Sequence, residues 1–160
     1  MRNYVIQNGK DSRYIKGLLI QELPAISKPL MRTSIEQIDG RDGDVITRLG
    51  YSAYDKKMKI GLFGDYDIDD IIPFFNTSGT VIFSNEPEKY YVYDILDAID
   101  YERLVRFRTA EITYHVQPFK YSNIEKLKVF NNPTSAITVR NNGNYVSKPI
   151  LHIKGSGTIN

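Results

Sequence analysis

The sequence predicts a mainly β fold: a β-sandwich with one short α-helix and a protruding β-hairpin arm. Three observations predict it. The stretch from Lys89 to Tyr121 is dense in β-branched and aromatic residues and contains no glycine. The dipeptide Asn8-Gly9 and the segment 39–44, which holds two Asp-Gly pairs, are typical of tight hairpin turns. Only residues 65–79 carry apolar side chains at helical spacing.

The stretch 89–121 is expected to form two long strands, Tyr90–Leu96 and Arg103–Val116, joined by a short acidic connection. In the second strand the apolar residues before Arg108 lie at odd positions, and those from Ala110 onward lie at even positions. A strict alternation cannot place all of them on one face of a sheet. Either a β-bulge near Arg108–Ala110 restores the alternation, or both faces are covered along part of the strand, which would require a neighbouring subunit.

Other strands flank this stretch on both sides. The type I′ turn at Asn8-Gly9 is expected to join a strand at Tyr4–Gln7 to a return strand at Tyr14–Leu23. The segment Tyr51–Leu62 is expected to reverse near Asp55-Lys56-Lys57 and to return as Met58–Leu62. A further strand is expected at Thr80–Phe83.

The predicted arm consists of Thr33–Ile38, the tip of residues 39–44, and Val45–Leu49. The flanks of the tip are polar and offer few residues to anchor a core, so the hairpin should project from the body. It is either a mobile surface hairpin or an arm that clasps a neighbouring subunit. In the second case the candidate contacts at its tip are Gly40, Arg41, Asp42 and Gly43.

The predicted helix has one apolar stripe, formed by Ile68, Ile71, Ile72 and Phe75. Aspartates at its start suit side-chain capping and the helix dipole. Pro73 is expected in the first turn, where its missing N–H does least harm, and Gly79 is a plausible stop.

The spacing Asp65-x-Asp67-x-Asp69 imitates the beginning of a calcium-binding loop. The sixth position is Asp70 where such a loop needs glycine, and the twelfth is Asn76 where it needs a bidentate glutamate. Helix capping is therefore the preferred interpretation, and no metal is expected.

The size of the chain, 160 residues and 18.4 kDa, suits one domain or one domain and the start of another. We expect a domain at 1–130 and the start or remnant of a second β domain at 131–160, with strands at Ala136–Val139 and Tyr145–Ile153. The absence of cysteine excludes thiol catalysis, cysteine-ligated zinc and disulfides. No apolar stretch has the length of a membrane span, so we expect no membrane insertion.

Charge is unevenly distributed along the chain. Residues 1–64 sum to +4, residues 65–102 to −9 and residues 103–160 to +7. One interpretation is chance with a solvated acidic face. The other is a subunit with two complementary faces, suited to head-to-tail contact with copies of itself.

No set of residues assembles into an active site. The two histidines, His115 and His152, have no Ser, Asp or Glu at catalytic or metal-binding spacing. The carboxylates between Asp94 and Glu102 lie on a predicted connection and are ordinarily solvated there. No glycine-rich phosphate loop precedes a helix. We therefore expect a protein that is not an enzyme and has no cofactor.

Arg103, Arg106 and Arg108 stand among aromatic residues, as in some nucleic-acid-binding strands. The pI of about 8.6 does not require nucleic acid. The preferred interpretation is that these arginines form cross-strand ion pairs with Asp94 or Asp97, or contact the acidic face of a neighbouring subunit.

Several short motifs, in order along most of the chain, resemble the N-terminal domain of the siphophage distal tail protein (Dit) family. These motifs are Asn8-Gly9 after the opening strand, Gly40–Asp44 followed by Tyr51–Tyr54, Ser84–Pro87 with Tyr90-Tyr91, Phe107, Gln117–Tyr121, and Asn142–Asn144 with Ser147–Ile150.

The resemblance implies a non-enzymatic structural subunit of a phage tail tip. Six such subunits would form a ring that connects the tail tube to the tail-tip protein and leaves a channel through which DNA passes. The expected partners are thus other copies of the chain, the tail-tube protein and the tail-associated tip protein. The expected location is the virion tail tip, after synthesis in the host cytoplasm. A carbohydrate- or receptor-binding β-sandwich module at the tail tip is the alternative.

Overall fold

The computed structural model describes residues 2–124, 127–131, 136–148 and 150–154. The chain divides into two units, Met1–Glu125 and Lys126–Asn160. All helices and strands of the described residues belong to the first unit. The predicted strands at Ala136–Val139 and Tyr145–Ile153 are absent from the described residues. An isolated hairpin without a packing partner is at best marginally stable, and side chains such as Val146 and Ile150 are exposed.

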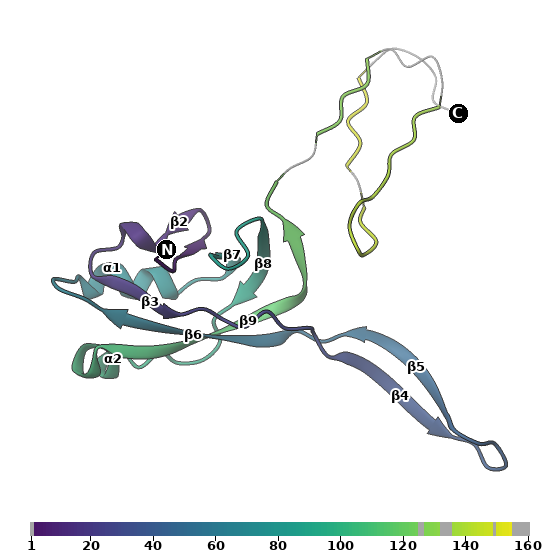
Figure 1. Cartoon of the computed structure of the whole chain (residues 1–160), viewed down its shortest axis with the longest axis horizontal. Coiled ribbons are helices and arrows are strands. Elements are labelled where there is room, and N and C mark those ends of the chain that lie inside the picture. Colours follow the sequence, from purple (N-terminus) through teal and green to yellow (C-terminus); the bar gives the residue numbers. More distant parts are fainter. Residues whose placement is uncertain (1, 125–126, 132–135, 149, 155–160) are drawn as a thin grey trace. The chain divides into compact units, whose positions relative to one another are not determined.

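The first unit is built on a seven-stranded antiparallel sheet with the order β2-β1-β7-β8-β9-β6-β3 (Figure 1). A separate two-stranded sheet is formed by β4 and β5. The strands are β1 (Val5–Gln7), β2 (Lys10–Asp11), β3 (Leu18–Glu22), β4 (Met31–Gln37), β5 (Asp44–Tyr51), β6 (Tyr54–Leu62), β7 (Gly79–Phe83), β8 (Lys89–Asp94) and β9 (Thr109–Ser122). The helices are the 3-10 turn η1 (Ser12–Tyr14), α1 (Ile68–Phe75) and α2 (Tyr101–Phe107).

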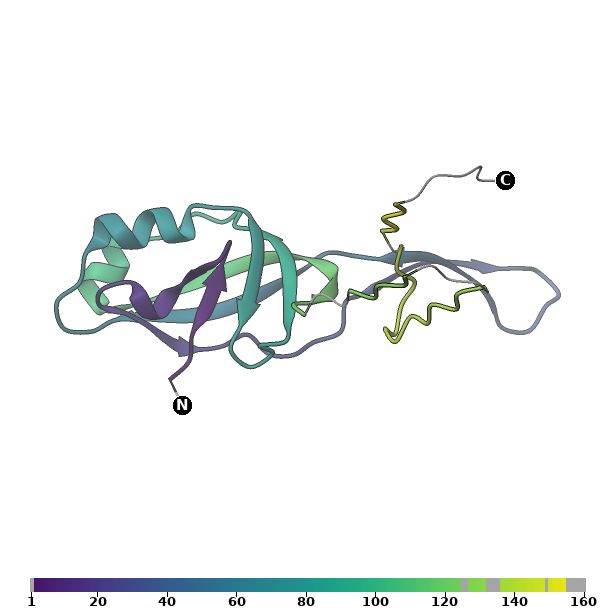
Figure 2. The ribbon, with the colours of Figure 1, turned by 90° about the horizontal axis from the view of Figure 1, so that it is seen from above.

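The seven-stranded sheet curls until its two ends approach each other (Figure 2). Side chains just before β1 bridge the seam to β3: Arg2 donates to the carbonyl of Leu18 at 2.6 Å, and Asn3 donates to that of Gln21 at 3.2 Å. These bonds occupy backbone acceptors on an edge strand, which would otherwise invite pairing with another chain. The prediction of a mainly β, sandwich-like fold is confirmed.

Aromatic rings from the middle of the sheet dominate the core. Tyr91, Tyr93 and Tyr114 are almost fully buried. The ring of Phe83 meets that of Tyr114 edge-on at 5.3 Å between centroids. The hydroxyls remain satisfied because the buried Gln7 donates to the Tyr114 hydroxyl and accepts from the Tyr93 hydroxyl at 3.2 Å. Since burial of an unpaired polar group is costly, Gln7 is the residue that makes a tyrosine-rich core possible.

The hairpin predicted at Asn8-Gly9 is present. Both residues have positive φ, 48° and 81°, as a type I′ turn requires. The return strand differs from the expected Tyr14–Leu23: the chain forms β2, passes through η1, and re-enters the sheet only at β3. Asp11 caps η1 by accepting from the backbone N–H of Arg13, and this local hydrogen bond explains why the strand is interrupted after β2.

The prediction of one continuous strand at Arg103–Val116 is wrong. Residues 101–107 form the helix α2, and β9 begins at Thr109. Asp100 caps α2 by accepting from the N–H of Arg103 at 2.8 Å, and Arg108 ends it in the left-handed conformation with φ of 59°. The phase change in the apolar pattern is therefore a helix-to-strand boundary. The phase change is explained neither by a β-bulge near Arg108–Ala110 nor by a strand that is covered on both faces.

Two further predictions need correction. The chain does not reverse near Asp55-Lys56-Lys57, because β6 is one strand of nine residues paired with β9 along its length. Pro73 lies at the sixth position of α1 and not in its first turn. The carbonyl that it cannot pair belongs to the exposed Asp69, so solvent can satisfy it. The helix ends at Phe75 with Asn76 as C-cap, before Gly79.

Candidate functional site

The arm formed by β4 and β5 projects from the seven-stranded sheet (Figure 1). Its strands pair from Met31 opposite Tyr51 to Gln37 opposite Asp44, with a register shift between Arg32 and Thr33. The hairpin predicted from the Asp-Gly pairs is thus present, and it extends beyond the predicted strand ends toward the body.

In the structure the last strand pair before the turn is Gln37 opposite Asp44, so the tip is extended by one residue from the predicted 39–44 to residues 38–44. Gly40 and Gly43 have φ of 79° and 81°, a region in which other residues are strained, so the two glycines shape the turn. The N–H of Arg41 donates to the carbonyl of Ile38 at 3.1 Å. Within the described residues, the side chains of Arg41 and Asp42 pair with no other side chain. The predicted contact residues of the tip are therefore all exposed and free to bind.

The shaft of the arm exposes apolar side chains on one face. Ile35 and Ile46 are directly opposite each other across the two strands, so they share a face, and they are 59% and 60% exposed. A two-stranded ribbon with no sheet packed against it has little stability of its own. Such an apolar pair on a protruding ribbon is typical of a surface that is covered on association.

The base of the arm is fastened to the body at several points. The N–H of Ser52 donates to the carbonyl of Leu30 at 2.9 Å, which closes the two strands at their body end. The ring of Tyr51 packs edge-on against that of Phe119 on β9, with centroids 5.8 Å apart. The connector that leads into β4 is held as well: Asn85 donates to the carbonyl of Pro24 at 2.9 Å.

A buried lysine makes the second bond to this connector. Lys56, on β6, is only 3% exposed, and its ammonium donates to the carbonyl of Ala25 at 2.7 Å. It also lies 5.0 Å from the ring centroid of Tyr91, a favourable cation–π distance. Burial lowers the pKa of Lys56, and the nearby Lys120 acts in the same direction, while Glu86 opposes them. Lys56 is thus a buried cation whose hydrogen bond to Ala25 holds the connector that leads into the arm.

Glu86 completes this group of polar residues. It accepts from the hydroxyl of Tyr91 at 2.5 Å and pairs with Lys120. Burial alone would raise the pKa of Glu86, but the hydrogen bonds from Lys120 and Tyr91 outweigh it and lower the pKa below its ordinary value. The pKa of Tyr91 is raised by burial and by Glu86, so its hydroxyl stays a donor. Glu86 is therefore engaged within the subunit and contributes little to an acidic outer face.

The three candidate arginines lie elsewhere. Arg103 and Arg106 are exposed on α2, and Arg108 is its C-cap, so the predicted strand positions are wrong for all three. The expected ion pairs with Asp94 or Asp97 do not occur among the described residues. Instead the guanidinium of Arg108 lies 4.7 Å from the ring centroid of Tyr66. Figure 1 places α2 at the end of the sheet opposite the arm, so arm and arginines form separate candidate surfaces.

The remaining sequence candidates have structural roles. Asp67 is the N-cap of α1 and accepts from the N–H of Asp69 at 3.0 Å, as capping predicts. His115 pairs with Asp55, its neighbour across β6 and β9, at 2.7 Å. In the described part of the chain, no group of three or more His, Cys, Asp or Glu side chains could hold a metal ion. Nor does any described helix reach the length and apolarity needed to cross a bilayer.

Comparisons with known proteins show a likeness at the level of the fold. No protein-family model and no curated protein matches the chain. Among solved structures it is similar to the Dit protein (gp 19.1) of phage SPP1, with a TM-score of 0.54 and 23% sequence identity. The likeness covers 76% of this chain and 52% of that one, so the chain spans about half the length of the SPP1 protein. That protein is described as a paradigm of the hub adsorption apparatus in phages that infect Gram-positive bacteria. At this identity the likeness establishes a shared fold.

Proposed function

We propose that this protein is a non-enzymatic structural subunit of a phage tail tip, where copies of it assemble into a ring of six. The ring would connect the tail tube to the tail-tip protein and leave a channel for DNA. The observation that carries the proposal is the shared fold with the SPP1 hub protein over three quarters of the chain. Its location would be the virion tail tip, after synthesis in the host cytoplasm.

The exposed arm supports self-assembly as the mode of action. Its shaft presents Ile35 and Ile46 and its tip presents Gly40–Gly43, all exposed among the residues that the structure describes. Because these two isoleucines are 59% and 60% exposed, covering them would stabilise an interface by about 1–2 kcal/mol for each side chain. The arm and the α2 arginines lie on different parts of the surface, which suits a heterologous contact between successive copies of a ring.

The carbohydrate- or receptor-binding alternative finds less support in the tyrosines. Three of the rings, those of Tyr91, Tyr93 and Tyr114, are buried in the core and cannot stack on a sugar. The more exposed pair, Tyr90 and Tyr121, stack on each other with centroids 5.3 Å apart and an interplanar angle of 23°.

Native mass spectrometry of the full chain over a range of concentrations tests the proposal. We expect a closed oligomer with six copies, and we expect the double variant Ile35→Ser and Ile46→Ser to shift it to smaller species. The matched control is Thr33→Ser, a polar change on the same face of β4 that should leave assembly unchanged. A wild-type chain that stays monomeric at every concentration, alone and with tail-tube protein added, would refute the proposal.

A further inference from the structure

An open hollow lies at the end of the sheet where β6 finishes. Its volume is about 600 Å³. It is lined by Arg2, the segment Arg13–Gly17, and Phe63, Gly64 and Asp65. Three segments far apart in the sequence thus meet here: the N-terminus, the turn before β3, and the turn after β6.

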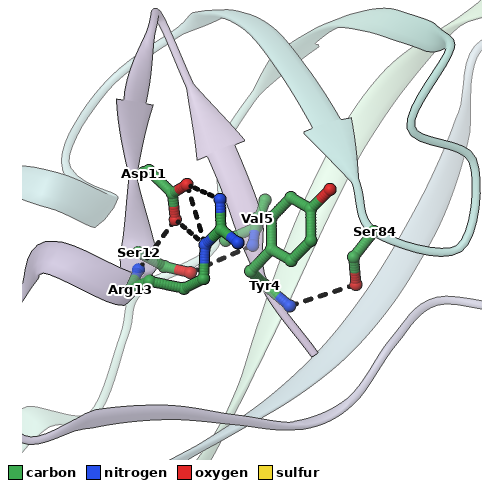
Figure 3. Close-up of polar contacts among 6 residues, drawn as sticks. All are labelled: Tyr4, Val5, Asp11, Ser12, Arg13 and Ser84. Carbon is green, nitrogen blue, oxygen red and sulfur yellow. Dashed lines mark hydrogen bonds and ion pairs between the residues drawn. The ribbon is translucent and has the colours of Figure 1, made fainter. Parts of the chain in front are cut away.

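Contacts within the subunit fix part of the wall of the hollow, at Arg13 and Gly17, before anything binds. The guanidinium of Arg13 is held by the carboxylate of Asp11, with contacts of 2.5–3.1 Å, and its Cζ atom lies 4.1 Å from the ring centroid of Tyr4 (Figure 3). The N–H of Phe63 donates to the carbonyl of Gly17 at 2.9 Å. Gly17 has φ of 73°, and a Cβ there would lie 2.6 Å from the carbonyl oxygen of Asp65. A preorganised wall loses little entropy on binding.

The chemistry of the hollow is basic and aromatic. Arg2, Arg13 and Lys16 line it with one acid, Asp65, and Asp11 pairs with Arg13 from beside the lining, so three basic groups and two acidic groups leave a local charge of +1. Lys16 is held only loosely, since its ammonium is 3.8 Å from Asp65 and both side chains are mostly exposed. The rings of Tyr14 and Phe63 are 88% and 76% exposed. A partner that fits must therefore bring negative charge together with some apolar surface.

The tip of the arm has this complementary chemistry. Its segment 38–44 carries three aspartates, Asp39, Asp42 and Asp44, and one arginine, so its net charge is −2. The apolar residue at its start, Ile38, is 51% exposed. The turn at the end of a two-stranded hairpin is narrow enough to enter an open hollow, whereas the flat face of a sheet is not.

The tip cannot reach the hollow of its own subunit. The arm leaves the body beside the first residue of β6, Tyr54, and the hollow lies beyond the last, Leu62. Nine residues of β6 span about 30 Å, and the seven residues of β4 carry the tip about 23 Å further away in extended geometry. Figures 1 and 2 both show the arm running away from the end that holds the turn after β6.

We propose that the hollow lined by Arg13, Lys16, Tyr14 and Phe63 is the docking site for the arm tip of a second copy of this chain. The inference rests on the proposed function, because it names the surface that the assembling arm engages. The contact is head-to-tail: each copy gives its tip to one neighbour and its hollow to the other. Such a contact propagates and closes into a ring when the rotation between copies allows it.

A charge exchange tests this contact directly. Lys16→Glu and Asp42→Lys should each weaken self-association by on the order of tenfold, with a strong dependence on salt, because both positions are exposed. In the chain that carries both substitutions every interface again pairs opposite charges, so we expect most of the affinity to return. Lys89→Glu, an equal change at an exposed lysine on β8, is the control and should have little effect. A double variant no tighter than the weaker single variant would overturn the docking site.

Cysteine cross-linking provides a second measurement, since the chain has no cysteine of its own. A mixture of Asp42→Cys and Tyr14→Cys chains, distinguished by isotopic mass, should yield a disulfide-linked heterodimer under mild oxidation. Glu88→Cys, at an exposed turn position, replaces Tyr14→Cys in the control and should not cross-link. If wild-type chains assemble but neither charge rescue nor cross-link is found, the hollow is wrong and the proposed ring survives. If wild-type chains do not assemble, both fail.

Discussion

Replacement of Lys56 by methionine should loosen the arm without unfolding the protein. The substitution removes the ammonium that donates to Ala25 at 2.7 Å and keeps an apolar chain of similar length in a site that is 3% exposed. A hydrogen bond from a charged group contributes about 1.5–3 kcal/mol, so its loss should raise local opening of the connector by about 10- to 150-fold.

The global free energy of unfolding should change by less than about 1 kcal/mol, because two effects offset each other. The lost hydrogen bond and cation–π contact destabilise the folded state, but the methionine side chain avoids the desolvation cost of a buried charge. Ala25 is exposed, so its carbonyl can bind water once the ammonium is gone.

Hydrogen exchange of the amides in 25–33, measured beside chemical denaturation, separates the two quantities. We expect faster exchange in this segment with an almost unchanged denaturation midpoint. The neighbouring Lys57→Met is the control, because Lys57 is exposed and pairs with Glu111 at 2.9 Å, away from the connector. If exchange is unchanged in Lys56→Met, or if that variant loses more than about 3 kcal/mol of global stability, the idea that Lys56 acts on the connector is wrong.

Three further predictions concern stability. Tyr114→Phe should cost about 1–3 kcal/mol in chemical denaturation, because it leaves the buried amide of Gln7 without its acceptor; a neutral result would contradict the role given to Gln7. Glu86→Gln should flatten the loss of stability in acid, measured as the unfolding free energy against pH. Because the pKa of Glu86 is lowered in the folded state, the stability that Glu86 contributes is present above its ordinary pKa of 4.5 and is lost as pH falls through the lower, folded-state value. If the variant loses stability in acid as steeply as the wild type, the pairing of Glu86 with Lys120 does not stabilise the fold. Gly17→Ala should destabilise by more than about 1 kcal/mol, since φ of 73° strains alanine, and a neutral melting temperature would contradict this close approach.

Local turn chemistry explains what the sequence predicted well. Asn8-Gly9 and the two Asp-Gly pairs of the arm determine their own reversals through positive φ, so no distant contact is needed to infer them. The cap at Asp67 is equally local. The class of fold follows from these turns and from the density of β-branched and aromatic residues between them.

The features that could not be predicted from the sequence depend on contacts between residues far apart in the chain. Residues 101–107 combine Tyr, Val and Phe, which favour strands, with Glu, Leu and Arg, which favour helices, so composition alone did not decide between the two; Asp100 was placed to cap a helix. The polar run Asp55-Lys56-Lys57 suggested a turn. It instead continues β6, where the side chain of Lys56 is buried and donates to the carbonyl of Ala25, far away in the sequence. The hollow could not be predicted at all, since Arg2, Tyr14 and Phe63 carry no shared local signal.

The most direct test of the proposed ring is electron microscopy of the purified full chain under the conditions at which it self-associates. We predict closed rings of six copies around a central opening, with the arm of each copy lying on the next in one direction only. Particles that remain single, or that pair about a two-fold axis with arm against arm, would contradict the account.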